Sequence, residues 1–105
     1  MKKVGNLQYD EQELARLCQE LGISYLALFG SYLHGDSTPT SDVDLLVEFK
    51  SIDGMGLFKY VGIQHKLADF LGKDKVDLVM KDALSKYFRD DVLSHAKTLY
   101  PNASN

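Results

Sequence analysis

The apolar residues of the first part of the chain recur at the spacing of a helix. They stand at positions i, i+3, i+4 and i+7, namely Leu14, Leu17, Cys18 and Leu21. This spacing places them on one face of a helix. Asp10 and Glu13 fit a capping box at its start, and Gly22 suits its C-terminal end. We therefore expect a first helix over residues 10–21.

Two later stretches carry similar apolar stripes. The first stops at Gly72 and consists of Leu57, Val61, Gln64, Leu67, Ala68 and Leu71. The second has a spacing close to four and consists of Leu84, Phe88, Val92, Ala96 and Leu99. We expect a helix over each stretch, and a polar tail over residues 101–105.

Three short runs have the character of strands. Residues 23–29 are an apolar run that ends at Gly30, and residues 42–49 and 75–80 alternate between two faces. In residues 42–49, one face carries Val43, Leu45, Val47 and Phe49, and the other carries Asp42, Asp44, Leu46 and Glu48. In residues 75–80, one face carries Val76, Leu78 and Met80, and the other carries Lys75, Asp77 and Val79.

The order of these elements indicates an α+β fold with an α/β-like sequence of helices and strands, and a sheet of three or four strands. Between the first two strands we expect one helical turn over residues 31–35 and a loop over residues 36–41. The chain of 105 residues shows no linker, repeat or low-complexity tract. Residues 1–105 are therefore expected to form one domain.

Composition narrows the functional classes. Twelve Lys and Arg against 15 Asp and Glu give a net charge of -3, which argues against direct binding of nucleic acid. The single cysteine, Cys18, permits no internal disulfide. No apolar run approaches the ~20 residues of a membrane span, and the N-terminus lacks the apolar core of a signal peptide. We expect a cytoplasmic protein without a membrane partner.

Asp42 and Asp44 are candidate metal ligands. They are two residues apart on a strand, so both side chains point the same way. Two carboxylates ~4 Å apart repel by about 4 kcal/mol at an effective dielectric constant of 20. A proton, a cation or solvent must offset this repulsion, and Mg²⁺ is commonly held by one or two carboxylates together with substrate phosphates. Asp77 joins the pair if its strand is a neighbour, because an acid in an apolar strand is costly unless it faces a site.

Gly30 and Ser31 are candidate phosphate ligands. A glycine lets the backbone approach a ligand closely, and N–H groups at the start of a following helix can bind an anion. The hydroxyl of Ser31 adds a donor. Phosphate donors on one side and metal-binding acids on the other suit a nucleoside triphosphate with Mg²⁺.

Each of these features alone is more common in a solvated turn or an edge strand, but their combination is specific. Gly30-Ser31, ten intervening residues, Asp42-x-Asp44 and the later strand acid Asp77 together resemble the minimal nucleotidyltransferases of the DNA polymerase beta-like superfamily. The resemblance covers nearly the whole chain and implies a small mixed β-sheet with helices packed on one side. It also implies a set of functional residues. Two Mg²⁺ ions would be bound by Asp42, Asp44 and Asp77, ATP would be held by Gly30, Ser31 and Ser41, and Asp77 would activate the attacking hydroxyl.

The resemblance implies a partner as well. Small stand-alone members of this family are commonly encoded beside an all-helical HEPN protein, and the pair resembles a toxin–antitoxin module. In that module the HEPN protein is a ribonuclease toxin. The nucleotidyltransferase is the antitoxin and transfers AMP from ATP to a tyrosine hydroxyl of the toxin. A hetero-oligomer is expected.

Two other functions remain open. One is modification of a small molecule, as in the aminoglycoside nucleotidyltransferases, although those usually carry an added helical domain. The other is a binding module that blocks a toxin by association alone. Tyr32 and His34 favour this second alternative, because many relatives have arginines there and so have more charge-assisted donors for a triphosphate. The three clustered acids argue against it, since binding alone does not require them.

Overall fold

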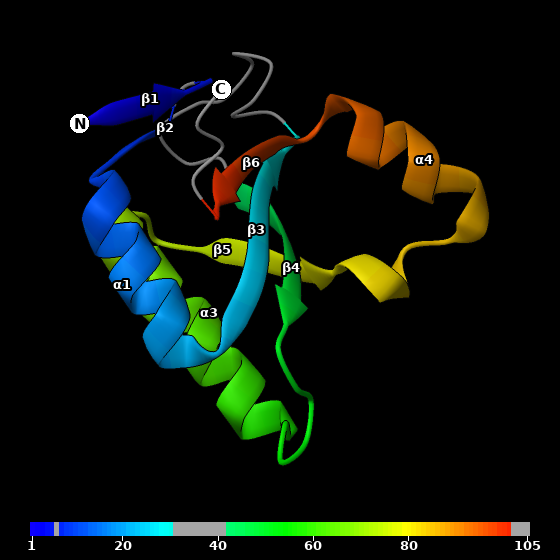
Figure 1. The fold of residues 1–105 in the computed structure, drawn as a ribbon, viewed down its shortest axis with the longest axis horizontal. Helices are drawn as coiled ribbons and strands as arrows, with labels where there is room; N and C mark the ends of the chain where they lie inside the picture. The colour runs from blue at the N-terminus through cyan, green and yellow to red at the C-terminus, as the bar shows by residue number, and fades with distance from the viewer. Residues whose placement is uncertain (6, 31–41, 102–105) are drawn as a thin grey trace.

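The fold is an α+β arrangement with a mixed sheet, as the sequence predicts (Figure 1). The computed structural model describes residues 1–5, 7–30 and 42–101. The helices are α1 (Glu11–Leu21), α3 (Leu57–Leu71), α4 (Lys86–His95) and a short 3-10 helix, η1 (Lys81–Ala83). The strands are β1 (Lys2–Val4), β2 (Leu7–Tyr9), β3 (Ile23–Phe29), β4 (Val43–Phe49), β5 (Val76–Met80) and β6 (Lys97–Tyr100). Within these described ranges, no helix has the length and apolar character needed to cross a membrane.

The main sheet has the strand order β5-β4-β3-β6. β4 pairs with β5 in parallel, and β3 pairs antiparallel with both β4 and β6. Because parallel neighbours need a crossover connection, α3 carries the chain from the end of β4 back to the start of β5. β1 and β2 form a separate antiparallel pair.

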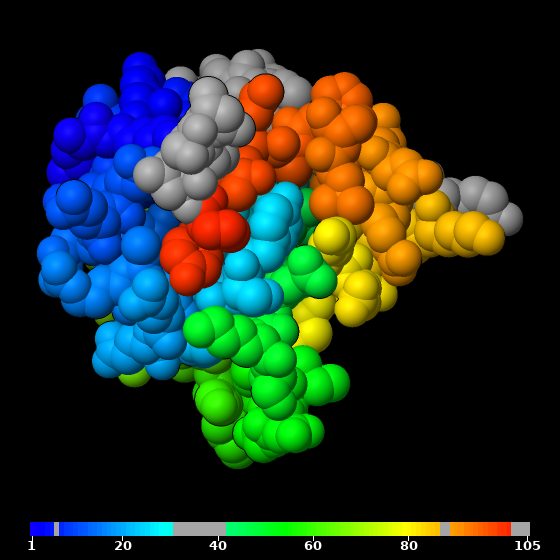
Figure 2. Space-filling view, viewed as in Figure 1, coloured from blue at the N-terminus to red at the C-terminus, as the bar shows by residue number. Residues whose placement is uncertain are grey.

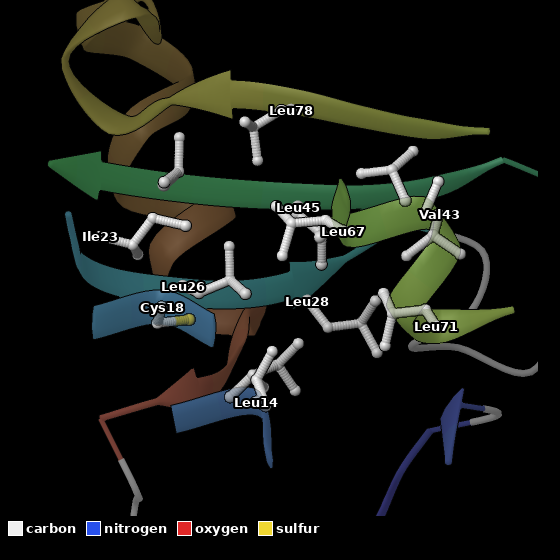
Figure 3. Packing of buried hydrophobic residues seen from close by; sticks show 14 of the residues in the cluster. Leu14, Cys18, Ile23, Leu26, Leu28, Val43, Leu45, Leu67, Leu71 and Leu78 are labelled. Carbon is white, nitrogen blue, oxygen red and sulfur yellow. The ribbon is translucent and has the colours of Figure 1, made fainter. Parts of the chain in front are cut away.

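The core lies between the sheet and the helices α1 and α3 (Figure 3). From α1 come Leu14 and Cys18, and from α3 come Leu67 and Leu71. They pack against alternate residues of the strands, which include Leu26, Leu28, Val43, Leu45 and Leu78. The face of β4 that carries Asp44 therefore points away from this helical layer, because successive strand residues alternate between faces.

The expected ends of the first helix are confirmed. The Asp10 side chain accepts a hydrogen bond of 3.1 Å from the backbone N–H of Glu13, which satisfies one of the free donors of the first turn. At the other end Gly22 adopts a left-handed conformation with φ of 74°. Its N–H turns back to the carbonyl groups of Cys18 and Gln19, as a glycine C-cap does.

The expected last helix over Leu84 to Leu99 is wrong at its C-terminal end. α4 ends at His95, and residues Lys97–Tyr100 form β6 instead. β6 lies along the outer edge of β3 (Figure 1). In this pairing Leu26 is opposite Tyr100. Leu99 is 2% exposed in this strand. The spacing of Ala96 and Leu99 fits a helix. Pairing with the free edge of β3 and burial of Leu99 favour a strand instead.

One further difference lies at the N-terminus. The sequence pattern predicts no helix or strand before residue 10, whereas β1 and β2 form a hairpin in which Val4 is opposite Leu7. The expected helical turn over 31–35 and loop over 36–41 lie outside the described residues, as does the tail beyond Pro101.

Candidate active site

The three acids named from the sequence come from neighbouring strands. Asp44 on β4 and Asp77 on β5 are direct partners in the parallel register. Aligned residues of neighbouring strands present their side chains on the same face. The predicted condition for Asp77 to join the aspartate pair is therefore met.

The pairing of β4 with β5 extends to Asp42 and Lys75, the residues that directly precede the two strands. The N–H of Val43 donates a 3.3 Å hydrogen bond to the carbonyl of Lys75, which sets Lys75 beside Asp42. Asp42 precedes Asp44 by two residues, and Lys75 precedes Asp77 by two residues. All four side chains therefore belong to one face, at the N-terminal end of both strands.

Alternating burial explains why the acids lie on this face. Val43 and Leu45 flank Asp44 and are completely buried in the core. Val76 and Leu78 flank Asp77 and are 3% and 5% exposed. The apolar partners fix the register, since a slip of one residue would turn the aspartates into the core.

Gly30 forms one wall of the site. It follows β3, whose last residue Phe29 is opposite Asp44 in the antiparallel register. Gly30 has φ of 81°, and a Cβ there would lie only 3.1 Å from Cγ of Asp44 and would overlap Oδ2. The carboxylate of Asp44 thus rests against bare backbone, which only glycine offers in this conformation.

The environment disfavours the charged form of Asp44. Burial is the larger cause and raises the pKa of this carboxyl above 3.8; the neighbouring Asp77 and Asp42 raise this pKa further. Like charges that share a site have this effect. A cation at the site would relieve the repulsion between the three carboxylates, so this group of acids favours the binding of a cation.

The ammonium of Lys75 lies between two of the acids. Its Nζ is 3.5 Å from Oδ2 of Asp42 and 3.7 Å from Oδ1 of Asp77. The sequence pattern alone does not single out this lysine as a site residue. The sequence contains one signal for Lys75, which is a repeated spacing. Lys75 stands two residues before Asp77, just as Asp42 stands two residues before Asp44.

The donor chemistry of the site fits a hard divalent cation. In the described part of the chain, no three acid, imidazole or thiol side chains are arranged to hold a metal ion together. The present side-chain arrangement has the Lys75 ammonium between Asp42 and Asp77. Carboxylate oxygens are the ligands that Mg²⁺ takes in proteins, and Asp42, Asp44 and Asp77 supply them on one face of the sheet.

Other residues discussed from the sequence do not enter this group or are not described. Glu48 lies at the other end of β4, opposite Tyr25, and its carboxylate is 3.5 Å from Nζ of Lys81. Ser31, Tyr32, His34 and Ser41 lie outside the described residues.

Comparison with known proteins connects this geometry to a family. Residues 11–99 match the family described as "Nucleotidyltransferase domain". The chain is also 38% identical over 77 residues to the protein adenylyltransferase MntA of Thermococcus cleftensis. That match covers 73% of this chain and 75% of the relative.

Solved structures share the fold. A toxin–antitoxin crystal structure with AMP-PNP superposes with a TM-score of 0.67 at 27% identity, over 87% of this chain and 73% of the other. The toxin–antitoxin structure MntA–HepT has a TM-score of 0.59 at 23% identity, over 86% and 68% of the two chains. The sequence pattern, the site geometry and the family match agree, and the chain belongs to the nucleotidyltransferase domain family.

Proposed function

We propose that this nucleotidyltransferase is a Mg²⁺-dependent antitoxin that transfers AMP from ATP to a tyrosine hydroxyl of a HEPN-family ribonuclease toxin. The observation that carries the proposal is the parallel register of β4 and β5, which sets Asp44 beside Asp77 on one face. Asp42 completes the acidic group, and the backbone of Gly30 bounds this group beside Asp44. Three neighbouring carboxylates repel one another, and a bound cation would offset that repulsion.

Known relatives support the nucleotide and the partner. The T. cleftensis relative is named a protein adenylyltransferase, which implies AMP transfer to a protein. The similar crystal structure is a toxin–antitoxin with AMP-PNP, an analogue of ATP. The HEPN family of the toxin and the tyrosine acceptor come from the family resemblance seen in the sequence, and form the finer part of the proposal.

The transfer uses the acids in distinct roles. Asp42, Asp44 and Asp77 would hold Mg²⁺, which neutralises phosphate charge during the reaction. Asp77 accepts the proton of the tyrosine hydroxyl. The hydroxyl oxygen then bonds to the α-phosphorus, the bond from this phosphorus to the bridging oxygen of the β-phosphate breaks, and pyrophosphate leaves. Gly30 allows the triphosphate to approach the backbone, with Ser31 and Ser41 as further nucleotide ligands.

Intact-mass spectrometry tests the proposal directly. A HEPN-family toxin is incubated with this protein, ATP and Mg²⁺. We expect the mass of the toxin to rise by one or more AMP units, and peptide mapping to place each unit on tyrosine. An Asp42→Asn/Asp44→Asn double variant is the control, since amides keep the shape of the side chains but remove the charge. An unchanged toxin mass with the wild-type protein would refute the transferase.

A further inference from the structure

We propose that Lys75 is a tethered counter-ion, which neutralises part of the acidic group in the metal-free enzyme and withdraws when Mg²⁺ binds. This inference rests on the proposed function, because it assigns the acids to Mg²⁺. It gives a role to a residue that neither the motif nor the reaction requires.

The geometry makes the placement of Lys75 a consequence of the fold. The parallel register sets Lys75 beside Asp42, and Asp77 beside Asp44. The four side chains therefore form a two-by-two array on one face of the sheet, in which one corner is cationic. The ammonium reaches both the cross-strand acid at 3.5 Å and the acid on its own strand at 3.7 Å. By contrast, Lys2 with Glu11 and Arg16 with Glu13 each join one cation to one carboxylate.

The ammonium offsets only part of the charge of the array. Three carboxylates and one ammonium leave two negative charges (3 − 1) when all four groups are charged. With the ammonium withdrawn, the three acids offer oxygen ligands only, which is the donor set that Mg²⁺ prefers. With the ammonium in place, a bare Mg²⁺ would meet a like charge beside Asp42 and Asp77.

The lysine is held loosely enough to leave. Both distances exceed the ~2.7–2.9 Å of a strong charge-assisted hydrogen bond. The side chain is 65% exposed, so it can swing into water without opening the core. A lysine also suits this task better than an arginine, because its ammonium is a compact charge on a flexible stem.

The experiment compares metal-free stability and metal affinity in three proteins. Lys75→Met keeps much of the side-chain length and removes the charge. Lys66→Met makes the same change on α3, in the surface groove between α1 and α3, away from the acids. Melting temperatures are measured in EDTA, and Mg²⁺ without nucleotide is titrated by calorimetry.

Loss of the counter-ion should have opposite effects on the two measurements. In EDTA we expect Lys75→Met to melt roughly 2–5 °C below the wild type, the size that an exposed ion pair supports in a small domain. We expect Mg²⁺ to bind Lys75→Met about two- to five-fold more tightly. Lys66→Met should match the wild type in both respects.

The outcomes separate this inference from the proposed function. If the wild type binds Mg²⁺ but Lys75→Met binds it no more tightly, the counter-ion role is refuted and the metal site stands. An unchanged melting temperature of Lys75→Met in EDTA would also refute the role. If no protein binds Mg²⁺, the proposed metal site fails, and the inference fails with it. Lys75→Gln repeats both measurements with a polar side chain and excludes an effect of the added thioether.

Discussion

At the scale of single residues, the site depends on a contact that only glycine permits. Gly30→Ala would bring a Cβ into the carboxylate of Asp44 and would place alanine at φ of 81°. We expect a loss of about 1–3 kcal/mol in the free energy of unfolding, measured by urea denaturation. Mg²⁺ affinity should fall as well, because Asp44 must move.

Gly54→Ala separates the two causes. Gly54 has a similar φ of 73°, but a Cβ there meets nothing within 4 Å. This variant carries the backbone strain without the overlap, so it should lose stability and keep the wild-type Mg²⁺ affinity. Equal Mg²⁺ affinity in Gly30→Ala and Gly54→Ala would contradict the role of Gly30 as a wall of the site.

Asp44 should make the metal-free protein less stable as the pH rises. Burial, Asp77 and Asp42 raise the pKa of its carboxyl above 3.8, so the folded state holds this proton more tightly than the unfolded chain does. The stability that the protonated form provides is therefore lost as the pH rises from about 4 through the raised pKa. In EDTA at pH 7, Asp44→Asn should unfold at higher urea, with a gain of up to about 1 kcal/mol.

The pH series supplies the check on this sign. At pH 3, Asp44 is largely protonated in both states, so the advantage of Asp44→Asn should largely disappear there. An advantage of the same size at pH 3 and pH 7 would assign the gain to packing instead of charge.

At the scale of the elements, the sequence predicts those whose pattern and local ends agree. α1 has both an apolar stripe and a capping residue, and α3 ends at Gly72 with φ of 68°. β6 could not be found in this way, because its conformation depends on the free edge of β3, which is distant in sequence. The acids were found from their spacing, but Lys75 was not, because its neighbours become visible only with the register of β4 and β5.

The cap of α1 gives a prediction at this scale. Asp10→Ala removes the side chain that accepts from the N–H of Glu13. We expect a loss of about 1 kcal/mol in the free energy of unfolding, measured by urea denaturation. Asp10→Asn should retain most of the stability, because its amide oxygen accepts the same hydrogen bond. Equal losses in the two variants would show that the charge of Asp10 matters more than the cap.

At the scale of the whole molecule, the acids and the exposed apolar side chains lie in different places. Asp44 and Asp77 sit on the sheet where β4 and β5 begin. Ile52, Leu57 and Phe58 are 66%, 74% and 92% exposed around the start of α3, where the chain projects from the body (Figure 2). A substitution at the acids can therefore abolish the proposed AMP transfer and leave most of the outer surface unchanged.

Because the acids and the exposed apolar side chains lie apart, a substitution at the acids can distinguish a transferase from a binding module that blocks the toxin. Asp77→Ala should still form a complex with the HEPN toxin, because the substitution changes one side chain and leaves the exposed apolar side chains at the start of α3 unchanged. It should fail to neutralise the toxin, since loss of a general base costs ~10²- to 10⁴-fold in rate, and loss of a metal ligand adds to this. Complex formation is measured by co-purification, and neutralisation by growth of cells that express both proteins. Asp69→Ala on α3 removes the same charge away from the acids and should rescue growth like the wild type. Full rescue by Asp77→Ala would mean that association alone silences the toxin, and the family fold would then serve here as a binding module.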